Sequence, residues 1–252
     1  MPHQKTSNCW LGWKWFCGIG WLVALLLSSW AMPRIYHRLV LRLPGTQSLD
    51  WQQVLAGKKR ELAAPWHDTR PLILFAGDSE IEFGSWYDLF AGAWAARNGG
   101  LARAKITDVT QLVSAVGDPH PKIVVLMCGI NNLGDGGERD ACLRDYETLL
   151  NAVGSHLQPK FTVVLSVMPV RESAVDHRVH QFNLNIIQFN AGLATCCRRH
   201  QVEFLDVNSV VAGANGGLAE NLTPDGLHLN LEGYRRLAQV ITPQLTSMMG
   251  TP

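Results

Sequence analysis

Several polar residues in this sequence stand just beyond apolar runs, where their side chains could carry out chemistry. The run in ILFAGDSEIEFGSW, residues 73–86, leads to Ser79, and the run in VVLMCGINN leads to Asn131. Near the C-terminus, the stretch TPDGLHL places Asp225 close before His228. A serine hydroxyl acts as a nucleophile when a histidine takes its proton and an acid orients that histidine. Together, these residue types would support acyl transfer.

Acyl transfer also needs hydrogen-bond donors that face the developing oxyanion. The candidate donors are the backbone N–H groups of Ser79 and Gly100 and the side-chain amide of Asn131. Taken singly, each residue has a structural alternative. Ser79 could be a helix N-cap, Gly99-Gly100 a turn, and Asp225 with His228 a solvated loop pair. The G-x-S-x-G elbow does not occur around Ser79, so the α/β-hydrolase fold is not indicated.

Alternating elements would have to position these side chains. Strand-like apolar runs occupy residues 72–76, 122–128, 161–168 and 202–206, and helical patterns occupy residues 85–96, 107–117, 138–157, 179–200 and 231–247. Strands separated by helices predict right-handed crossovers and a parallel sheet that is covered on both faces. We therefore expect one three-layer α/β domain over residues 71–250. Residues 44–70 are predicted to be a linker with one short helix.

Four sequence blocks, in this order, resemble the signature of the SGNH (GDSL-type) hydrolases. They are GDS at 77–79, the glycine of NGG at 100, GINN at 129–132 and DGLH at 225–228. The branch that is most similar contains the catalytic subunits of platelet-activating-factor acetylhydrolase. The resemblance implies a flavodoxin-like α/β/α sandwich with a five-stranded parallel sheet and no metal or organic cofactor. It also implies that Ser79 is the nucleophile, His228 the base and Asp225 its partner, with Ser79, Gly100 and Asn131 forming the oxyanion hole.

The sequence departs from the family pattern at a few positions. Asn132 stands where an aspartate is usual, and we expect a small effect because that acid is mostly structural. Arg103 stands where many relatives have a second glycine, which would alter the loop or bring a cation near the site. A solvated loop arginine is the structural alternative. Glu80 and Glu82 are unusual directly after the serine, and favourable interaction with a helix dipole suffices to explain them.

Composition excludes several other kinds of function. The formal net charge is +1, which gives no electrostatic argument for binding nucleic acid. The six cysteines include no C-x-x-C pair, so neither a structural zinc site nor a disulfide framework is expected.

The N-terminal segment has the composition of a membrane span. No charged side chain occurs from Trp15 to Pro33, and tryptophans flank this segment at both ends. We expect residues 1–43 to form an anchor that faces the periplasm or the cell exterior, with a short amphipathic extension over residues 34–42. A signal peptide cleaved after Ser29-Trp30-Ala31 is the alternative. Basic residues on both sides leave the orientation open.

We carry forward the hypothesis of a serine esterase or deacylase acting on O-acyl groups of a small molecule, a lipid or a sugar. One alternative is an O-acyltransferase, in which a sugar hydroxyl replaces water as the acceptor. The other is a tethered binding domain without catalysis, although the complete set of Ser79, Asn131, Asp225 and His228 argues against it.

Overall fold

The computed structural model describes residues 50–90, 94–117, 120–172 and 177–249. The chain divides into two units, Met1–Gln53 and Val54–Pro252. The predicted span from Trp15 to Pro33 and its amphipathic extension lie outside the described residues. Of the helices in the described part, none is both long enough and apolar enough to cross a membrane.

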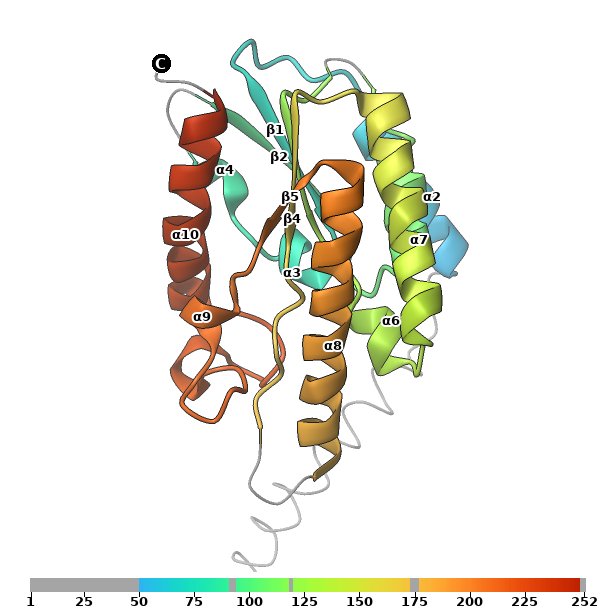
Figure 1. The fold of residues 1–252 in the computed structure, drawn as a ribbon. Coiled ribbons are helices and arrows are strands. Elements are labelled where there is room, and N and C mark those ends of the chain that lie inside the picture. Colours follow the sequence, from blue (N-terminus) through green and yellow to red (C-terminus); the bar gives the residue numbers. More distant parts are fainter. Residues whose placement is uncertain (1–49, 91–93, 118–119, 173–176, 250–252) are drawn as a thin grey trace, which may run out of the picture. The chain divides into compact units, whose positions relative to one another are not determined.

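A five-stranded parallel sheet forms the centre of the second unit (Figure 1). Its order is β2-β1-β3-β4-β5, and all neighbouring strands pair in parallel. The strands are β1 (Leu72–Gly77), β2 (Ala95–Gly100), β3 (Ile123–Met127), β4 (Phe161–Leu165) and β5 (Glu203–Leu205). This sheet, with helices on both faces, confirms the predicted three-layer α/β class.

The continuous apolar sequences of β1 and β3 follow from burial on both faces of the sheet. Every residue of these two strands is buried. Parallel strands under crossover helices need this pattern, because neither face meets water. Ile73, Phe75 and Val125 face one core, which they share with Leu237 and Ile241 of the last helix.

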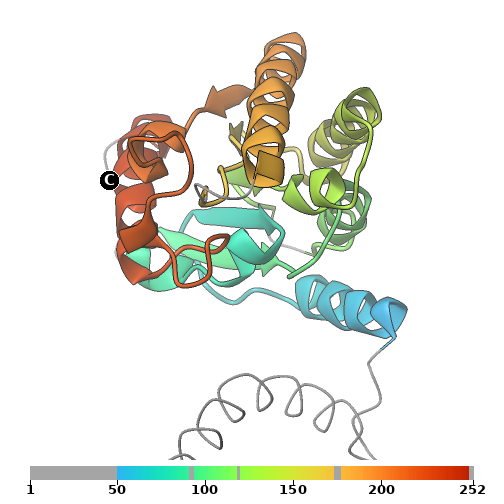
Figure 2. The same cartoon turned by 90° about the horizontal axis from the view of Figure 1, so that it is seen from below.

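The helices fall into two layers (Figure 2). One layer contains α4 (Trp86–Leu89), α9 (Asn208–Val211) and α10 (Leu231–Met249), and the other contains α5 (Ile106–Val113), α7 (Arg139–Ala152) and α8 (His177–His200). The shorter helices are α3 (Ser79–Glu82), α6 (Ile130–Gly134), the π-helical turn η1 (Val153–Leu157) and the 3-10 turn η2 (Glu220–Leu222). Helices α3 and α6 directly follow β1 and β3, so both lie at the carboxyl ends of central strands.

The predicted helix over residues 85–96 is wrong at its C-terminal end. Among the residues described there, Trp86–Leu89 form the short helix α4, whereas residues 95–100 form β2 at the edge of the sheet. The sequence AARNGG has low β-propensity, because it contains no β-branched or aromatic residue. Its register with β1, from Leu72↔Ala95 to Gly77↔Gly100, makes it a strand.

The segment that we expected to be a linker with one short helix contains α2 (Trp51–Ala63), in which Leu55 and Leu62 are buried. The Gly117 N–H donates to the Leu62 carbonyl at 3.0 Å. Buried Arg97 donates to the Glu61 carbonyl at 2.6 Å. A cation at the carbonyl end of a helix is favourable, so Arg97 stabilises the end of α2.

Candidate active site

Ser79 is the first residue of α3, immediately beyond the carboxyl end of β1. The N-cap of this helix is Asp78, whose Oδ1 accepts the Glu80 N–H at 3.1 Å. The structural alternative for Ser79 is therefore wrong, because Asp78 performs the capping. Gly77 permits the close approach of β1 to the end of β3, because a Cβ on Gly77 would lie 2.0 Å from the Met127 carbonyl oxygen.

A chain of hydrogen bonds joins Ser79, His228 and Asp225. The Ser79 Oγ lies 3.1 Å from the His228 Nε2, and the His228 Nδ1 lies 2.7 Å from the Asp225 Oδ2. These distances are within the range for a nucleophile, a base and the acid that orients the base. The three residues named from the sequence thus meet in space.

The loop before α10 holds this histidine in place. Asp225 Oδ1 accepts the backbone N–H groups of Leu227 and His228, each at 2.9 Å. Burial raises the pKa of Asp225, but the hydrogen bonds from His228 and Leu227 outweigh burial and hold this pKa well below its usual range. Asp225 is therefore ionised near neutral pH, which favours the tautomer with the proton on Nδ1 of the imidazole.

Phe83 packs edge-on against the imidazole of His228, with 5.1 Å between the ring centroids. Its side chain is half exposed. Phe83 thus covers one side of the histidine and offers an apolar surface beside it.

Asn131 and Asn132 lie in the first turn of α6 at the carboxyl end of β3, and the N-cap of this helix is Gly129 with φ of +130°. The Asn131 Nδ2 donates to the Ala104 carbonyl at 3.1 Å, which leaves the second hydrogen of this amide for another acceptor. Asn132 Oδ1 accepts the Ile106 N–H at 3.0 Å and so caps the start of α5. Asn132 therefore has a structural contact that explains it.

The expectation that Gly100 supplies an oxyanion donor needs correction. The Gly100 N–H already donates to the Asn98 Oδ1 at 2.9 Å. A Cβ at Gly100 would lie 2.2 Å from the backbone nitrogen of Glu82. The glycine is required because the backbones of β2 and α3 meet here, and its N–H is engaged within the protein.

Arg103 presents a different backbone donor in the same loop. Its φ of +68° is left-handed, a region that costs a residue with a Cβ about 1–2 kcal/mol. The other described non-glycine residues with positive φ, Gln158 and Gln201, directly follow helix ends, whereas Arg103 does not. No hydrogen bond of the Arg103 N–H is formed with any residue that the structure describes. From the sequence, this position was expected to alter the loop or to bring a cation near the site, and its backbone N–H was not considered.

Comparisons with known proteins identify the family of the chain. The sequence profile of the GDSL-like lipase/acylhydrolase family matches residues 74–236, which is more than half of the chain. The chain belongs to this family. The hydrolase therefore acts on ester bonds, as its sequence blocks predicted. No curated protein matches the chain.

Solved structures share the fold of this GDSL hydrolase at low sequence identity. A structure described as a platelet activating factor from Streptococcus pneumonia is 21% identical with a TM-score of 0.69, over 89% of this chain and 98% of that chain. A structure described as an acylhydrolase from Bacteroides fragilis is 19% identical with a TM-score of 0.64, and the match covers 80% of this chain and 99% of that chain. The aryl esterase of M. smegmatis is 15% identical with a TM-score of 0.56, and the match covers 70% of this chain and 99% of that chain.

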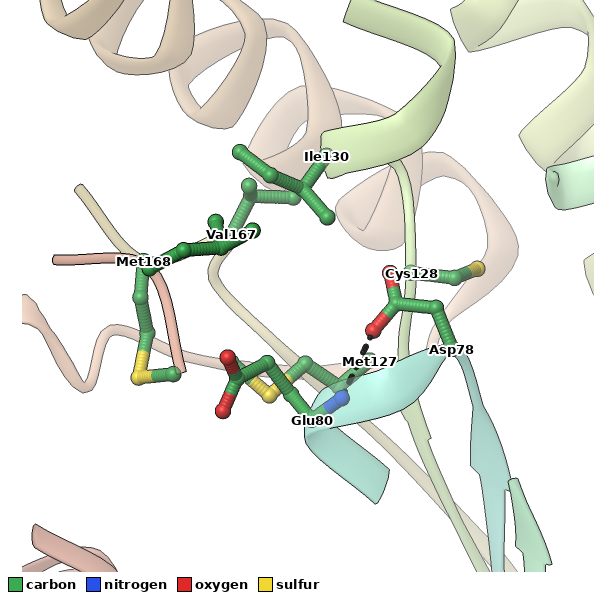
Figure 3. A pocket seen from close by; sticks show the side chains of 8 residues that line it. Asp78, Glu80, Met127, Cys128, Ile130, Val167 and Met168 are labelled. Atoms are coloured by element: carbon green, nitrogen blue, oxygen red, sulfur yellow. Dashed lines mark hydrogen bonds between the residues drawn. The ribbon is translucent and has the colours of Figure 1, made fainter. Parts of the chain in front are cut away.

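Two buried carboxyl groups of the GDSL hydrolase flank Ser79 in the sequence. Asp78 and Glu80 line a cavity of about 10 Å³, together with Ile130, Val167 and Met168 (Figure 3). That volume has room for about one water molecule. Burial raises the pKa of Asp78 to about 7 and the pKa of Glu80 to about 8. The helix dipole was expected to explain Glu80 as an acid, but only 5% of the residue is exposed, and burial keeps its carboxyl mostly protonated at neutral pH.

Glu80→Gln is expected to change how stability depends on pH. Because the folded-state pKa of Glu80 is about 8 and its ordinary value is 4.5, the folded chain keeps a proton in this window that the unfolded chain releases. The free energy of unfolding therefore falls as pH rises from about 4.5 to 8. Glutamine cannot ionise, so Glu80→Gln should raise Tm at pH 8 by about 5 °C and much less at pH 5.

Thermal unfolding at pH 5, 6.5 and 8 measures this difference. Glu232→Gln is the control, because Glu232 is an exposed residue of α10 and should give the same small change at each pH. If the Tm of Glu80→Gln changed with pH in parallel to the Tm of the wild type, the raised pKa of Glu80 would be contradicted.

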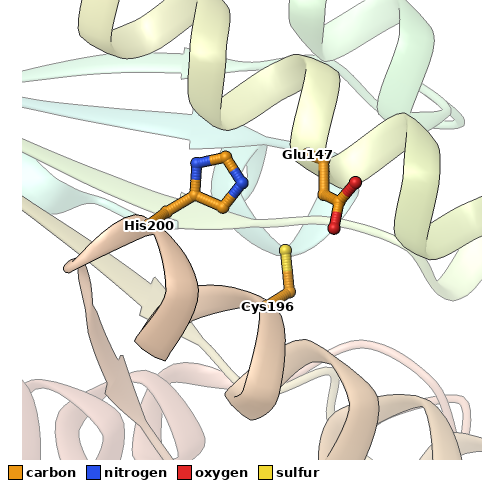
Figure 4. Close-up of side chains that lie close together, drawn as sticks. All are labelled: Glu147, Cys196 and His200. Carbon is orange, nitrogen blue, oxygen red and sulfur yellow. The ribbon is translucent and has the colours of Figure 1, made fainter.

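One group of potential metal ligands lies at the far end of α8 (Figure 4). Ligand atoms of Glu147, Cys196 and His200 lie within 4.8 Å of one another. Arg199 already forms an ion pair with Glu147, and it also hydrogen-bonds to the Cys196 thiol. The guanidinium occupies the place of the cation, so we assign no metal to this group.

A groove of about 400 Å³ opens beside Asn131 and Asp225. Its apolar walls come from Ile130, Val170, Val179, Phe182 and Leu227, and Arg171 also lines it. Small-molecule sites have volumes of this order and mostly apolar walls.

Proposed function

We propose that this GDSL hydrolase is a serine esterase or deacylase that cleaves O-acyl esters by covalent catalysis. The observation that carries the proposal is the continuous hydrogen-bond chain from Ser79 through His228 to ionised Asp225. In this scheme Ser79 is the nucleophile, His228 the general base and Asp225 the group that orients the base.

In the acylation step, the Ser79 Oγ attacks the ester carbonyl carbon while His228 Nε2 takes the hydroxyl proton. The tetrahedral intermediate collapses, and the same proton goes to the alkoxide as the alcohol leaves. Water then attacks the acyl-serine, His228 takes a proton from that water, and the proton returns to Ser79 as the acid is released.

Three donors would stabilise the oxyanion in each step: the Ser79 N–H, the Arg103 N–H and the second N–H of the Asn131 amide. Arg103 replaces Gly100 in this set. Support comes from the engaged Gly100 N–H, and from the two neighbours of Arg103. Ala102 donates to Glu82 and Ala104 accepts from Asn131, whereas none of the described residues accepts the Arg103 N–H.

The acyl group would lie in the groove beside Asn131 and Asp225. Ile130, Val179 and Phe182 favour an apolar chain, and a volume of about 400 Å³ has room for more than an acetyl group. We therefore propose a short-chain to medium-chain acyl ester as the substrate.

A fluorophosphonate probe on the full-length chain tests the function. The probe should label Ser79, as found by peptide mapping, and hydrolysis of p-nitrophenyl esters should rise from acetate towards hexanoate. Absence of labelling would favour a binding domain without catalysis. Transfer of the acyl group to an added sugar in preference to water would favour the O-acyltransferase.

Asn131→Ala should lower kcat by about 10²–10³-fold with little change in KM, because the amide acts mainly on the oxyanion of the transition state. Steady-state kinetics on p-nitrophenyl butyrate measure both constants. Asn132→Asp is the matched neighbour: its carboxylate can still accept the Ile106 N–H, and kcat should stay within a few-fold of wild type. A raised KM with unchanged kcat for Asn131→Ala would make Asn131 a ground-state binding residue.

We also propose that Trp15–Pro33 stays attached and holds the hydrolase on the outer face of a membrane. The segment has 19 residues without a charge, close to the ~20 that cross a bilayer core. N-terminal sequencing that finds Met32 or Pro33 first would eliminate the anchor. A C-terminal phosphatase fusion that stays inactive would place the hydrolase on the opposite face.

A further inference from the structure

We propose that Glu82 is a positioning residue that holds the loop of Arg103 in the conformation needed for oxyanion stabilisation. This inference rests on the proposed function, because it assigns a support to one of the donors named there. Glu82 lies on the same short helix as Ser79, so it can couple the position of the loop to the position of the nucleophile.

The carboxylate of Glu82 makes a short hydrogen bond to this loop. Its Oε2 accepts the Ala102 N–H at 2.6 Å. A carboxylate that accepts a backbone N–H forms a stronger bond than a neutral acceptor does. The residue next to this anchored peptide is Arg103.

Side chains from α6 hold the other end of the loop. The Asn131 amide donates to the Ala104 carbonyl at 3.1 Å, and Asn132 accepts the Ile106 N–H at 3.0 Å. Arg103 therefore lies between two anchored peptides, one tied to α3 and the other to α6.

The conformation of Arg103 requires these anchors. A left-handed φ is unfavourable for arginine and persists only where surrounding contacts determine it. Without the Glu82 acceptor, Ala102 would be free to move and Arg103 could relax to negative φ. That change would rotate the Arg103 N–H away from its present direction.

Asn98 makes the anchor on α3 rigid. Its Nδ2 lies 3.0 Å from the carbonyl oxygens of Ile81 and Glu82 and 3.1 Å from that of Gly84. The α3 backbone is therefore fixed against the end of β2 independently of the Glu82 side chain. Removing that side chain should disturb the loop and leave the helix in place.

Glu82→Leu and Glu82→Gln separate positioning from simple burial. Glutamine keeps an oxygen that can accept the Ala102 N–H, whereas leucine fills similar space without an acceptor. We expect kcat to fall about 10²-fold in Glu82→Leu with KM nearly unchanged, and at most a few-fold in Glu82→Gln. The affinity for a trifluoromethyl ketone, whose adduct carries an oxyanion, should fall by the same factor as kcat/KM.

Glu138→Leu is the matched control. The Glu138 carboxylate also accepts backbone N–H groups, those of Asp140 and Ala141 at the start of α7. Its loss should lower Tm and leave both kcat and ketone affinity within a few-fold of the wild type.

Arg103→Gly in the Glu82→Leu background gives a further test that does not depend on the single variant being fully stable. Glycine adopts positive φ without the penalty, so the double variant should recover at least tenfold in kcat. The proposal is overturned if Glu82→Leu keeps kcat within a few-fold, if Glu82→Gln is as slow as Glu82→Leu, or if glycine gives no recovery. Failure of the proposed function is a separate result, seen as wild-type protein whose Ser79 is not labelled by the fluorophosphonate.

Discussion

Replacing Ser79 with alanine is expected to lower kcat by about 10⁶-fold, to the small residual rate that binding and oxyanion stabilisation give without a nucleophile. The thermal midpoint should change by no more than a few degrees. Ser79 makes one described side-chain hydrogen bond, to His228, and such a bond contributes about 1 kcal/mol. Steady-state hydrolysis of p-nitrophenyl butyrate and a thermal melt measure the two effects.

Ser166 provides the matched serine, because it lies just beyond the carboxyl end of β4 as Ser79 lies beyond that of β1. Its hydroxyl donates to Asp206 at 2.9 Å and accepts the Val207 N–H at 3.0 Å. Ser166→Ala should lower Tm clearly and leave kcat within a few-fold. If kcat of Ser79→Ala fell only a few-fold, Ser79 would not be the nucleophile.

His228→Ala is expected to lower kcat by a factor comparable to that of Ser79→Ala, because a hydroxyl without a base is a poor nucleophile at neutral pH. The double variant Ser79→Ala, His228→Ala should be no slower than either single variant, since residues that act as a unit are not additive. Kinetics of all three variants at one pH complete the cycle.

His180 gives a control for this cycle. Its imidazole also contacts a carboxylate, Glu172, at 3.2 Å, but His180 is exposed on α8. His180→Ala should leave kcat within a few-fold of the wild type. If the losses of Ser79→Ala and His228→Ala multiplied in the double variant, the two residues would act independently, and the proposed proton transfer between them would be refuted.

Much of the sheet could be predicted because β1 and β3 are continuous apolar runs that end in polar residues. The edge strand β2 could not, since AARNGG has no strand propensity of its own. Pairing with β1 makes it a strand, and the Asn98 side chain, through bonds to backbone groups of α3, ties its end to that helix. These contacts join β2 to β1 and to α3, so the hydrophobicity pattern within AARNGG does not reveal them.

The motif positions of Ser79, Asn131, Asp225 and His228 could be read from the sequence, because the residue types and their order restrict the chemistry. The second backbone donor could not. The Gly100 N–H is engaged by a single hydrogen bond to Asn98 Oδ1, and the order of residue types does not predict that bond.

Glu80 and Glu82 show the same limit. Both are acids on the first turn after Ser79, yet one is buried beside Asp78 and the other accepts the N–H of a neighbouring loop. The direction of each side chain on α3 separates them, and that direction depends on how the helix is docked.

The contact between Ser79 and His228 joins residues that are 149 positions apart. The hydroxyl of Tyr234 on α10 similarly donates to the Glu80 carbonyl across 154 positions. A ribosome that adds about 5–20 residues per second needs roughly 7 to 30 seconds to pass from the serine to the histidine. During that time β1, β3 and β4 can pair, but the serine has no histidine beside it. The nascent chain therefore carries a serine without its proposed base until the loop of His228 and helix α10 have emerged and docked.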